Sequence, residues 1–220
     1  MKREVVDTGD GSKTIRIIDL EENYHSSHGA LQEAMHVFIE NGLKATDKKD
    51  LNIFEMGFGT GLNAFITGVV AKDIGKHVFY QGVEAYPVSK EELEALSYSN
   101  LLGEENKEVF DRVHDVEWER KQIISDHLEV LKNESKLEDL TLQDNFFDVI
   151  YYDAFGPRTQ SEVWSVNLFQ KMYDSLKKGA FLVTYCAQGQ VKRNMKAVGF
   201  EIEKLAGPPG KREMTRAWKR

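Results

Sequence analysis

Residues 51–63 read LNIFEMGFGTGLN, and this stretch decides the fold. Its first four residues form an apolar run typical of a buried strand, and residues 64–70, AFITGVV, are typical of a packed helix. Between them Gly57, Gly59 and Gly61 occupy alternate positions. Glycine has no Cβ to keep a ligand away from the backbone, and it adopts positive φ without strain. The stretch therefore predicts a strand, a tight turn and a helix that bind a nucleotide-like ligand.

An acidic residue ends each of the first two strands of this unit. Glu55 stands just before the glycine turn, where a carboxylate would repel a pyrophosphate but attract a ligand with a cationic head. This favours S-adenosylmethionine (SAM) over a nicotinamide dinucleotide. Residues 77–84 read HVFYQGVE, a second strand whose last residue, Glu84, lies 23 residues beyond Gly61. An acid at about this spacing can accept hydrogen bonds from both ribose hydroxyls.

The composition is that of a single globular enzyme. A chain of 220 residues can bury a sizeable core. It has no apolar run of about 18 residues and no signal peptide at its start, so we expect a cytoplasmic protein with no membrane partner. A single cysteine, Cys186, excludes an internal disulfide and a cysteine-cluster zinc site. His25, His28 and His36 lack a cysteine partner, so we expect no metal.

Charge is distributed unevenly along the chain. The formal net charge of −7 argues against indiscriminate nucleic-acid binding. Residues 188–220, however, carry nine Lys and Arg and three Glu, a net charge of +6 against −13 for the rest of the chain. A basic face on an acidic protein can dock a polyanion at one place. A solubilising charged tail is the alternative.

The order of the expected elements indicates the fold class. Residues 4–8 and 14–18 flank a GDGS turn and predict a β-hairpin, and residues 30–41 have helical periodicity with Gly42 as the C-terminal cap. From residue 51 onward strands alternate with helices. We predict strands at 51–56, 77–84, 127–131, 147–152, 179–186, 200–205 and 214–218, and helices at 62–73, 88–98, 118–126, 162–177 and 189–198.

This alternation predicts an α/β, Rossmann-like fold with a mainly parallel seven-stranded sheet and helices on both faces. We divide the chain into an N-terminal extension, residues 1–50, with the hairpin and a helix, and a main domain, residues 51–220. In such a sheet the chemistry lies at the carboxyl ends of the strands. Asp153 follows the strand 147–152 at that edge, beside the expected methyl donor, and Pro157 constrains the next loop. An Asp that caps a turn is the alternative.

Taken in order, the motifs resemble a known family. The glycine turn is followed by Asn63, the second strand runs into Glu84-Ala85-Tyr86-Pro87, and Asp153-Ala154-Phe155-Gly156-Pro157 is followed by Trp164. The set is completed by Tyr24-His25-Ser26, Thr184-Tyr185-Cys186-Ala187, Val191-Lys192-Arg193 and Gly210-Lys211-Arg212-Glu213-Met214. Together they are similar to the methyltransferase half of the MnmC-like tRNA-modifying family. With no oxidoreductase half in the sequence, the chain resembles the stand-alone MnmD type.

The resemblance implies a class I methyltransferase that uses SAM. It implies as substrate 5-aminomethyl-(2-thio)uridine at the wobble position of tRNA, with the 5-methylaminomethyl form as product and a separate enzyme supplying the aminomethyl precursor. The acceptor is a primary amine, which at neutral pH is mostly an ammonium and must lose a proton before it attacks a methyl group. Asp153 is the predicted catalytic carboxylate. Because the sulfonium is already activated, this reaction needs no metal.

The resemblance also assigns roles to the other site residues. For cofactor binding these are Glu55, the backbone of Gly57, Gly59 and Gly61, and the side chains of Asn63, Glu84, Glu134 and Tyr185. For substrate binding they are Tyr24, His25, Phe155, Pro157 and Trp164 around the uridine, and Lys192, Arg193, Lys211 and Arg212 on the phosphates of the anticodon stem-loop. Glu134 is included because relatives carry Gly-Asp where this chain reads KNES at 132–135. Trp164 and Phe155 can stack on a base; packing of the helix that begins near Glu162 is the alternative.

Other function classes stay open from the sequence. An aminopropyltransferase resembling spermidine synthase would share the sheet and the strand-end Asp, but Glu55 and the basic tail count against it. A non-catalytic RNA-binding module is opposed by the intact Glu55, Glu84 and Asp153. An adenine-N6 methyltransferase would carry an Asn-Pro-Pro-aromatic motif in place of residues 153–156, DAFG.

Overall fold

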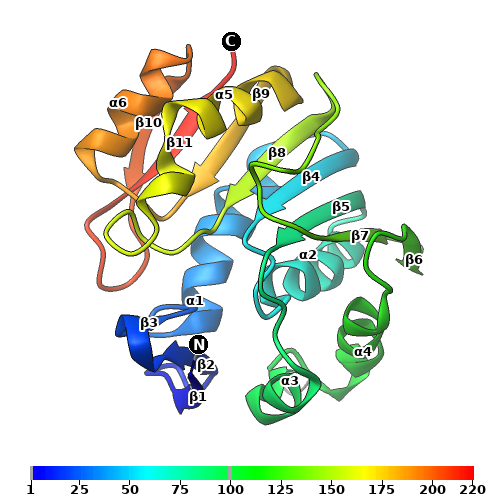
Figure 1. Cartoon of the computed structure of the whole chain (residues 1–220). Helices are drawn as coiled ribbons and strands as arrows, with labels where there is room; N and C mark the ends of the chain where they lie inside the picture. Colours follow the sequence, from blue (N-terminus) through cyan, green and yellow to red (C-terminus); the bar gives the residue numbers. More distant parts are fainter. Residues whose placement is uncertain (1, 99–100) are drawn as a thin grey trace.

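The computed structural model describes residues 2–98 and 101–220, and an eight-stranded sheet runs through it (Figure 1). The strands follow the order β10-β11-β9-β8-β4-β5-β7-β6. The inner pairs β8–β9, β4–β8, β4–β5 and β5–β7 are parallel, whereas β6, β11 and β10 pair antiparallel. Their bounds are β4 (Asp50–Met56), β5 (His77–Glu84), β6 (Gln122–Ser125), β7 (Leu128–Glu134), β8 (Phe147–Tyr152), β9 (Leu176–Thr184), β10 (Glu201–Ala206) and β11 (Glu213–Trp218). The mainly parallel α/β fold is confirmed, with one strand more than predicted.

Both faces of the sheet are buried, which explains the near-continuous apolar strands. Along β4, Ile53 faces one core cluster and Phe54 the other. The helices are α1 (Ala30–Ala34), α2 (Leu62–Asp73), α3 (Lys90–Leu96), α4 (Lys107–Asp115), α5 (Val166–Ser175) and α6 (Gly189–Ala197). Helices α1, α2 and α4 supply the first cluster, and α5 and α6 supply the second (Figure 1). None of the helices within residues 2–98 and 101–220 is long and apolar enough to cross a membrane.

The N-terminal segment forms a small sheet of its own. Strands β1 (Arg3–Asp7), β2 (Lys13–Ile17) and β3 (Glu22–Asn23) pair antiparallel, so the predicted hairpin is present and gains a short third strand. Arg3 fastens this sheet to the loop after β5, because its guanidinium donates to the carbonyls of Tyr86 (2.7 Å) and Pro87 (3.2 Å). The boundary between residues 1–50 and 51–220 stays a prediction.

The helix predicted at 30–41 has a different form from the one expected. After α1 it continues as a wider π-helical turn, Met35–Glu40. Gly42 is not a left-handed cap, since its φ is −116°. A Cβ at Gly42 would lie 2.2 Å from the Phe38 carbonyl oxygen and 2.8 Å from the Tyr151 ring. Gly42 is therefore needed for close packing against the sheet.

The charged middle of the chain differs most from the prediction. The helix expected at 118–126 is absent, and the chain forms α4 earlier and β6 within that range. In α4, Phe110 and Val113 are spaced for one buried face, and the Phe110 ring meets Phe65 of α2 with centroids 5.4 Å apart. Strand β6 forms because it can add to the free edge of β7, a tertiary contact that helical periodicity cannot reveal.

Candidate active site

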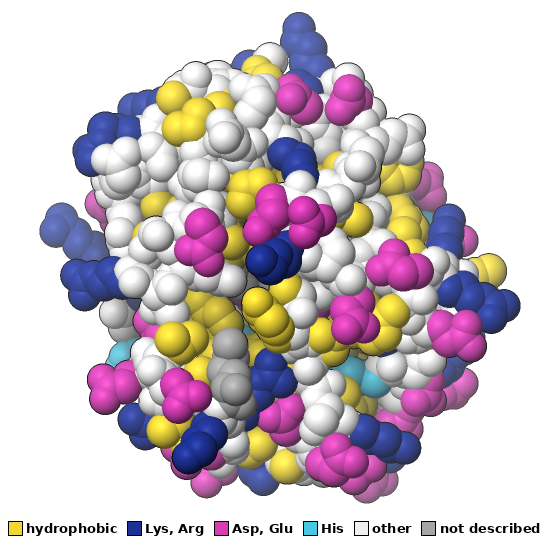
Figure 2. Space-filling model, viewed as in Figure 1, with side chains coloured by type: hydrophobic (Ala, Val, Ile, Leu, Met, Phe, Trp, Pro, Cys, Tyr) yellow, Lys and Arg dark blue, Asp and Glu magenta, His cyan; other side chains and the backbone are white. Residues whose placement is uncertain are grey.

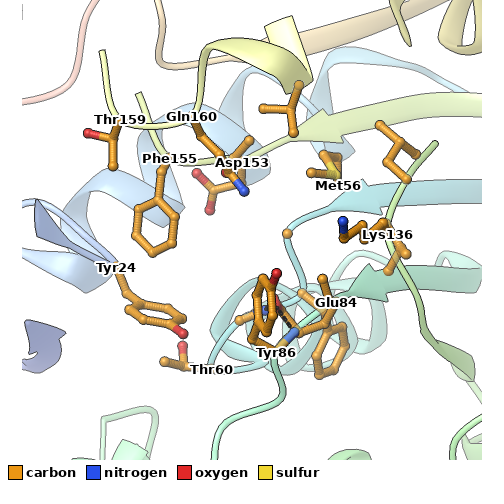
Figure 3. A pocket seen from close by; sticks show the side chains of 18 of the residues that line it. Tyr24, Met56, Thr60, Glu84, Tyr86, Lys136, Asp153, Phe155, Thr159 and Gln160 are labelled. Atoms are coloured by element: carbon orange, nitrogen blue, oxygen red, sulfur yellow. Dashed lines mark hydrogen bonds between the residues drawn. The ribbon is translucent and has the colours of Figure 1, made fainter. Parts of the chain in front are cut away.

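The sheet order creates a crevice at the carboxyl end of β4. From β4 the chain continues into β5 on one side, while β8 lies on the other, and open α/β sheets bind ligands at such a reversal. A cavity of about 320 Å³ lies there. The glycine turn, the ends of β5 and β8, residues 135–138 and the N-terminal segment line it (Figure 3). Figure 2 shows hydrophobic side chains in a hollow near the middle of this face, with acidic and basic side chains around it.

The three glycines of the turn have separate tasks. All have positive φ, at 87°, 51° and 69° for Gly57, Gly59 and Gly61. Gly57 lines the cavity, and a Cβ on it would lie 2.6 Å from the Asp153 carbonyl oxygen. Gly59 lines it too and donates its N–H to Glu84 Oε2 (2.9 Å). Gly61 does not line the cavity: a Cβ there would lie 2.8 Å from His114 Nε2, so this glycine lets α4 pack against the turn. Its contact with the cofactor stays a prediction.

Asn63 joins two carboxyl groups at the floor of the cavity. It lies in the first turn of α2, and its Nδ2 donates to Glu55 Oε1 (2.7 Å) and to Asp153 Oδ2 (2.9 Å). Its own Oδ1 is buried and has no hydrogen-bond partner among the described residues. Buried polar atoms are normally satisfied. An acceptor at the cavity wall fits a ligand that brings a donor, such as the ammonium of a methionine moiety.

Glu55 is placed differently from the sequence-based assignment. Its side chain is fully buried behind Asn63 and is not part of the cavity wall. Burial raises the pKa of Glu55 well above its ordinary value, and the neighbouring Asp153 adds to this. Glu55 therefore holds Asn63 in place instead of contacting a cationic ligand directly.

Asp153 faces the cavity from the end of β8. Its backbone N–H donates to the Met56 carbonyl (2.9 Å), which fixes it beside the glycine turn. Burial, followed by the charge of Glu33, raises the pKa of Asp153 to about 7, although Asn63 and Lys211 act in the opposite direction. A carboxyl group with this pKa can accept and release a proton near neutral pH.

Glu84, a predicted cofactor ligand, lines the cavity on the β5 side. Its Oε2 accepts from Gly59 and its Oε1 from the Tyr86 N–H (2.9 Å). Each carboxylate oxygen can accept more than one hydrogen bond, so both can also accept from hydroxyls. Glu134, by contrast, is exposed and lies outside the cavity. The wall after β7 is formed by residues 135–138, with Lys136 labelled in Figure 3, because the chain turns inward only after the strand.

Tyr24, His25 and Phe155, the predicted uridine contacts, all line the cavity, and Figure 3 shows Tyr24 and Phe155 there. The Tyr24 and Phe155 rings meet edge to face with centroids 5.1 Å apart. Burial lowers the pKa of His25 to about 4, so its ring is neutral at neutral pH. The three neighbouring histidines do not converge, since His36 Nε2 lies 2.8 Å from the Ala206 carbonyl oxygen. No three His, Cys, Asp or Glu side chains are grouped for a metal within the described ranges.

Three aromatic or loop residues lie elsewhere than expected. Trp164 is buried, and its Nε1 donates to the Phe155 carbonyl (2.8 Å), so it packs behind Phe155 and cannot stack on a base. Tyr185 and Pro157 line a second, more open hollow on the other side of the Asp153 loop. The Tyr185 hydroxyl donates to the Ala154 carbonyl (2.8 Å). Tyr185 therefore lies outside the main cavity, and its contact with the cofactor stays a prediction.

The four basic candidates fall into two kinds. Lys192 is paired with Glu213 (3.3 Å), and Lys211 with Glu33. Their assignment to RNA phosphates is not supported, because both charges are used within the fold. Arg193 is exposed and bonded to Gln190 (2.8 Å), and Arg212 is exposed at the rim of the second hollow.

Sequence reasoning missed several residues of the cavity. Arg3 and Leu20 line it from the N-terminal segment, far from the motifs in sequence. Thr159 and Gln160 line it from the loop after β8, and Thr159 donates to Glu22 Oε1 (2.7 Å). For Thr159 and Gln160, the one available signal in the sequence is that they lie close to Asp153 and Pro157.

Comparison with known proteins agrees with this geometry. Residues 104–220 match a family model described as an S-adenosyl-L-methionine-dependent methyltransferase. The chain is 33% identical over 211 residues to the protein of Marinomonas sp. (strain MWYL1), and 31% identical over 208 residues to that of Cupriavidus metallidurans. Both are named tRNA 5-methylaminomethyl-2-thiouridine biosynthesis bifunctional protein MnmC.

These alignments cover 87% of this chain and 30% of each relative, so the chain spans about a third of the relatives' length. In structure the chain is similar to the crystal structure of MnmC2 from Aquifex aeolicus, with a TM-score of 0.75 and 22% identity over 100% of this chain and 70% of that one. Because the family model matches more than half of the sequence, the chain belongs to this family of S-adenosyl-L-methionine-dependent methyltransferases, and SAM is its cofactor.

Proposed function

We propose that this chain methylates the primary amine of 5-aminomethyl-(2-thio)uridine at the tRNA wobble position, giving the 5-methylaminomethyl form. The observation that carries the proposal is Asp153, a carboxyl group with a pKa of about 7 at the wall of the cofactor cavity. A base with this pKa suits an acceptor that must lose a proton, as an ammonium does. The similarity to proteins named for 5-methylaminomethyl-2-thiouridine biosynthesis supports the same substrate.

The residues of the cavity divide the work as follows. Gly57, Gly59 and Glu84 would hold the nucleoside part of SAM, and Asn63 Oδ1 would accept from its ammonium. When bound, SAM supplies a methyl group whose bond to sulfur breaks as the bond to nitrogen forms, with the electron pair staying on sulfur. Alignment of the reacting atoms is then the main contribution of the protein.

Asp153 handles the proton of the acceptor. Asn63 occupies one of its carboxylate oxygens, which leaves the other for the amine. The proton of the substrate ammonium passes to this oxygen, the neutral amine attacks, and Asp153 then releases the proton to water. The edge-to-face pair of Tyr24 and Phe155 flanks the path to Asp153 and forms an aromatic wall for the uridine ring.

We also propose the setting of the reaction. The RNA approaches across the exposed Arg193 and Arg212, the reaction takes place in the cytoplasm, and a separate enzyme supplies the aminomethyl precursor. Membership in the methyltransferase family leaves no support for aminopropyl transfer or for a non-catalytic RNA-binding role.

The test is to mix the protein with methyl-labelled SAM and tRNA from cells that cannot complete the modification, and to identify the labelled nucleoside after digestion. We expect 5-methylaminomethyl-(2-thio)uridine, and no label on tRNA from cells that complete the modification. Label in a ring-methylated nucleoside would overturn the proposal, as would the absence of label.

A further inference from the structure

Three residues that are far apart in the sequence, Glu33, Tyr185 and Lys211, meet behind the loop that carries Asp153. Lys211 lies in the loop between β10 and β11, and its Nζ forms an ion pair with Glu33 on α1. The same Nζ lies 3.9 Å from the centre of the Tyr185 ring. The Tyr185 hydroxyl bonds the carbonyl of Ala154, the residue next to Asp153. Lys211 is thus held at one place at the back of the Asp153 loop.

Glu33 is equally fixed. Only 12% of its side chain is exposed, against 35% of the Lys211 side chain. Its second carboxylate oxygen, Oε2, accepts from the Ser26 N–H (2.9 Å). A buried carboxylate with two partners is held in one position. The pair therefore places one fixed negative and one fixed positive charge near the reacting carboxyl group.

We propose that Lys211 and Glu33 are positioning residues that together set the ionisation of Asp153, and that Lys211 does not serve as a phosphate contact. The inference rests on the role given to Asp153 in the proposed function. It assigns opposite effects to the two charges: Lys211 favours the carboxylate, and Glu33 favours the protonated acid.

The groups around Asp153 agree with this assignment. The charge of Asp153 acts on Glu55 of β4, Tyr80 of β5 and Tyr185 after β9, and Asp153 is in turn acted on by Glu33 of α1, Asn63 of α2 and Lys211 of the β10–β11 loop. Burial raises the pKa of Glu55, Tyr80 and Tyr185 well above their ordinary values. The charge of Glu33 raises the pKa of Asp153, and that of Lys211 lowers it. Of the groups named here, Lys211 is the one whose positive charge favours the ionised form of Asp153.

The direct test is a titration of the free protein labelled with carboxyl-¹³C aspartate, with the Asp153 signal assigned from its loss in Asp153→Asn. In Lys211→Met we expect the Asp153 midpoint to rise by about one pH unit. Lys211→Arg, which keeps the charge, should restore the wild-type midpoint. Glu33→Gln should move it downward, and this second variant gives an independent reading if Lys211→Met folds poorly.

The matched control is Lys196→Met, which removes the same charge from an exposed position at the end of α6. Its midpoint should equal that of the wild type. The proposal is overturned if Lys211→Met leaves the midpoint unchanged, or if Lys196→Met moves it equally. The first result would mean that Lys211 only stabilises the fold. The second would mean that any positive charge on the protein has the same effect.

Activity gives a second, separable readout. In single-turnover methyl transfer, Lys211→Met should shift the acid limb of the pH–rate profile upward and lower the rate at neutral pH roughly fivefold, with the salt dependence of tRNA binding unchanged. An unchanged acid limb would contradict the inference. If the wild-type protein methylates no tRNA, the proposed function fails, whereas the titration of the free protein still decides whether Lys211 and Glu33 control Asp153.

Discussion

A single amide connects the two acidic groups on which the site depends. Asn63 donates to both Glu55 and Asp153, so two carboxyl groups share one small volume. Burial raises the pKa of both groups; the charge of Asp153 adds to the rise at Glu55, and the charge of Glu33 adds to the rise at Asp153. Glu55 is sealed off, while Asp153 opens on the cavity. The outer group is therefore the one that can exchange a proton with a substrate.

At the residue scale, replacing Asp153 by Asn should separate proton handling from packing. Asn can still accept from Asn63, but it cannot take a proton, so single-turnover methyl transfer at neutral pH should fall by roughly 10²–10⁴. In the wild type, activity should be lost as the pH falls through about 7, where Asp153 becomes protonated. Raising the pH should recover part of the loss in the variant, because more of the amine is then neutral. Near-normal rates with unchanged SAM affinity by calorimetry would leave Asp153 as a loop-shaping residue.

The same carboxyl group should cost stability when it ionises. Its pKa is raised on folding from an unfolded value near 3.8 to about 7, so the native state binds more protons than the unfolded state between those values. Stability from this group is therefore present at low pH and is lost as the pH rises toward 7 and beyond. Asp153→Asn should melt at a higher temperature than the wild type at pH 8, but not at pH 4. An equal or lower melting temperature at pH 8 would contradict the buried-charge account.

At the scale of elements, the glycine turn is the part that a single substitution tests best. In Gly59→Val a β-branched side chain would have to adopt φ near 51°, with its Cβ 3.2 Å from Tyr24 Cδ1. Calorimetry should show SAM binding abolished. Gly75→Val is the matched control, since Gly75 also has positive φ (65°) but a Cβ there meets nothing within 4 Å. Loss of SAM affinity in both variants alike would point to a general loss of structure.

Local patterns explain which elements could be predicted. The strand–turn–helix from residue 50 to residue 73 could be predicted because apolar strand, glycines and helix are adjacent in sequence. The placement of Glu55, Glu84 and Asp153 near one edge of the sheet could also be predicted, because the carboxyl ends of parallel strands meet at the same edge. By contrast, the ion pair of Glu33 and Lys211 joins residues 178 positions apart, and no sequence pattern indicates it.

The misplaced assignments have physical reasons of the same kind. Trp164 and Tyr185 are close to the Asp153 loop in space, but their polar groups bond its carbonyls from behind. A glutamate such as Glu55 can attract a cationic ligand. Here, however, its carboxylate accepts a hydrogen bond from the Asn63 amide instead. Side-chain direction at a strand end depends on the whole cavity wall, which sequence alone does not describe.

At the scale of the whole molecule, many cations of the basic segment, residues 188–220, form ion pairs within the fold. Of its cations, Lys192, Lys211, Arg216 and Arg220 are each paired with a glutamate. Figure 2 likewise shows acidic and basic side chains interspersed on the face that it presents. RNA binding would therefore depend on a few exposed cations near the site, such as Arg193 and Arg212, and would depend little on a broad basic surface.

Removing these two arginines should weaken tRNA binding without affecting SAM. In Arg193→Ala/Arg212→Ala the slope of the logarithm of affinity against the logarithm of salt concentration should fall by about two. Arg120→Ala is the control, since Arg120 is exposed but paired with Glu117 away from the cavity. A normal slope in the double variant would place the RNA on another surface.

Anticodon stem-loops that differ only in the group on C5 of the wobble uridine test most directly whether Asp153 serves an amine acceptor. Three are compared in single-turnover methyl transfer with labelled SAM: aminomethyl, hydroxymethyl and hydrogen. We predict methylation of the aminomethyl RNA alone, on its exocyclic nitrogen. The reason is that a carboxylate with a pKa of about 7 can take a proton from an ammonium but not from an alcohol. Methyl transfer to the hydroxymethyl or unsubstituted RNA, or to a ring atom of any of the three, would contradict it.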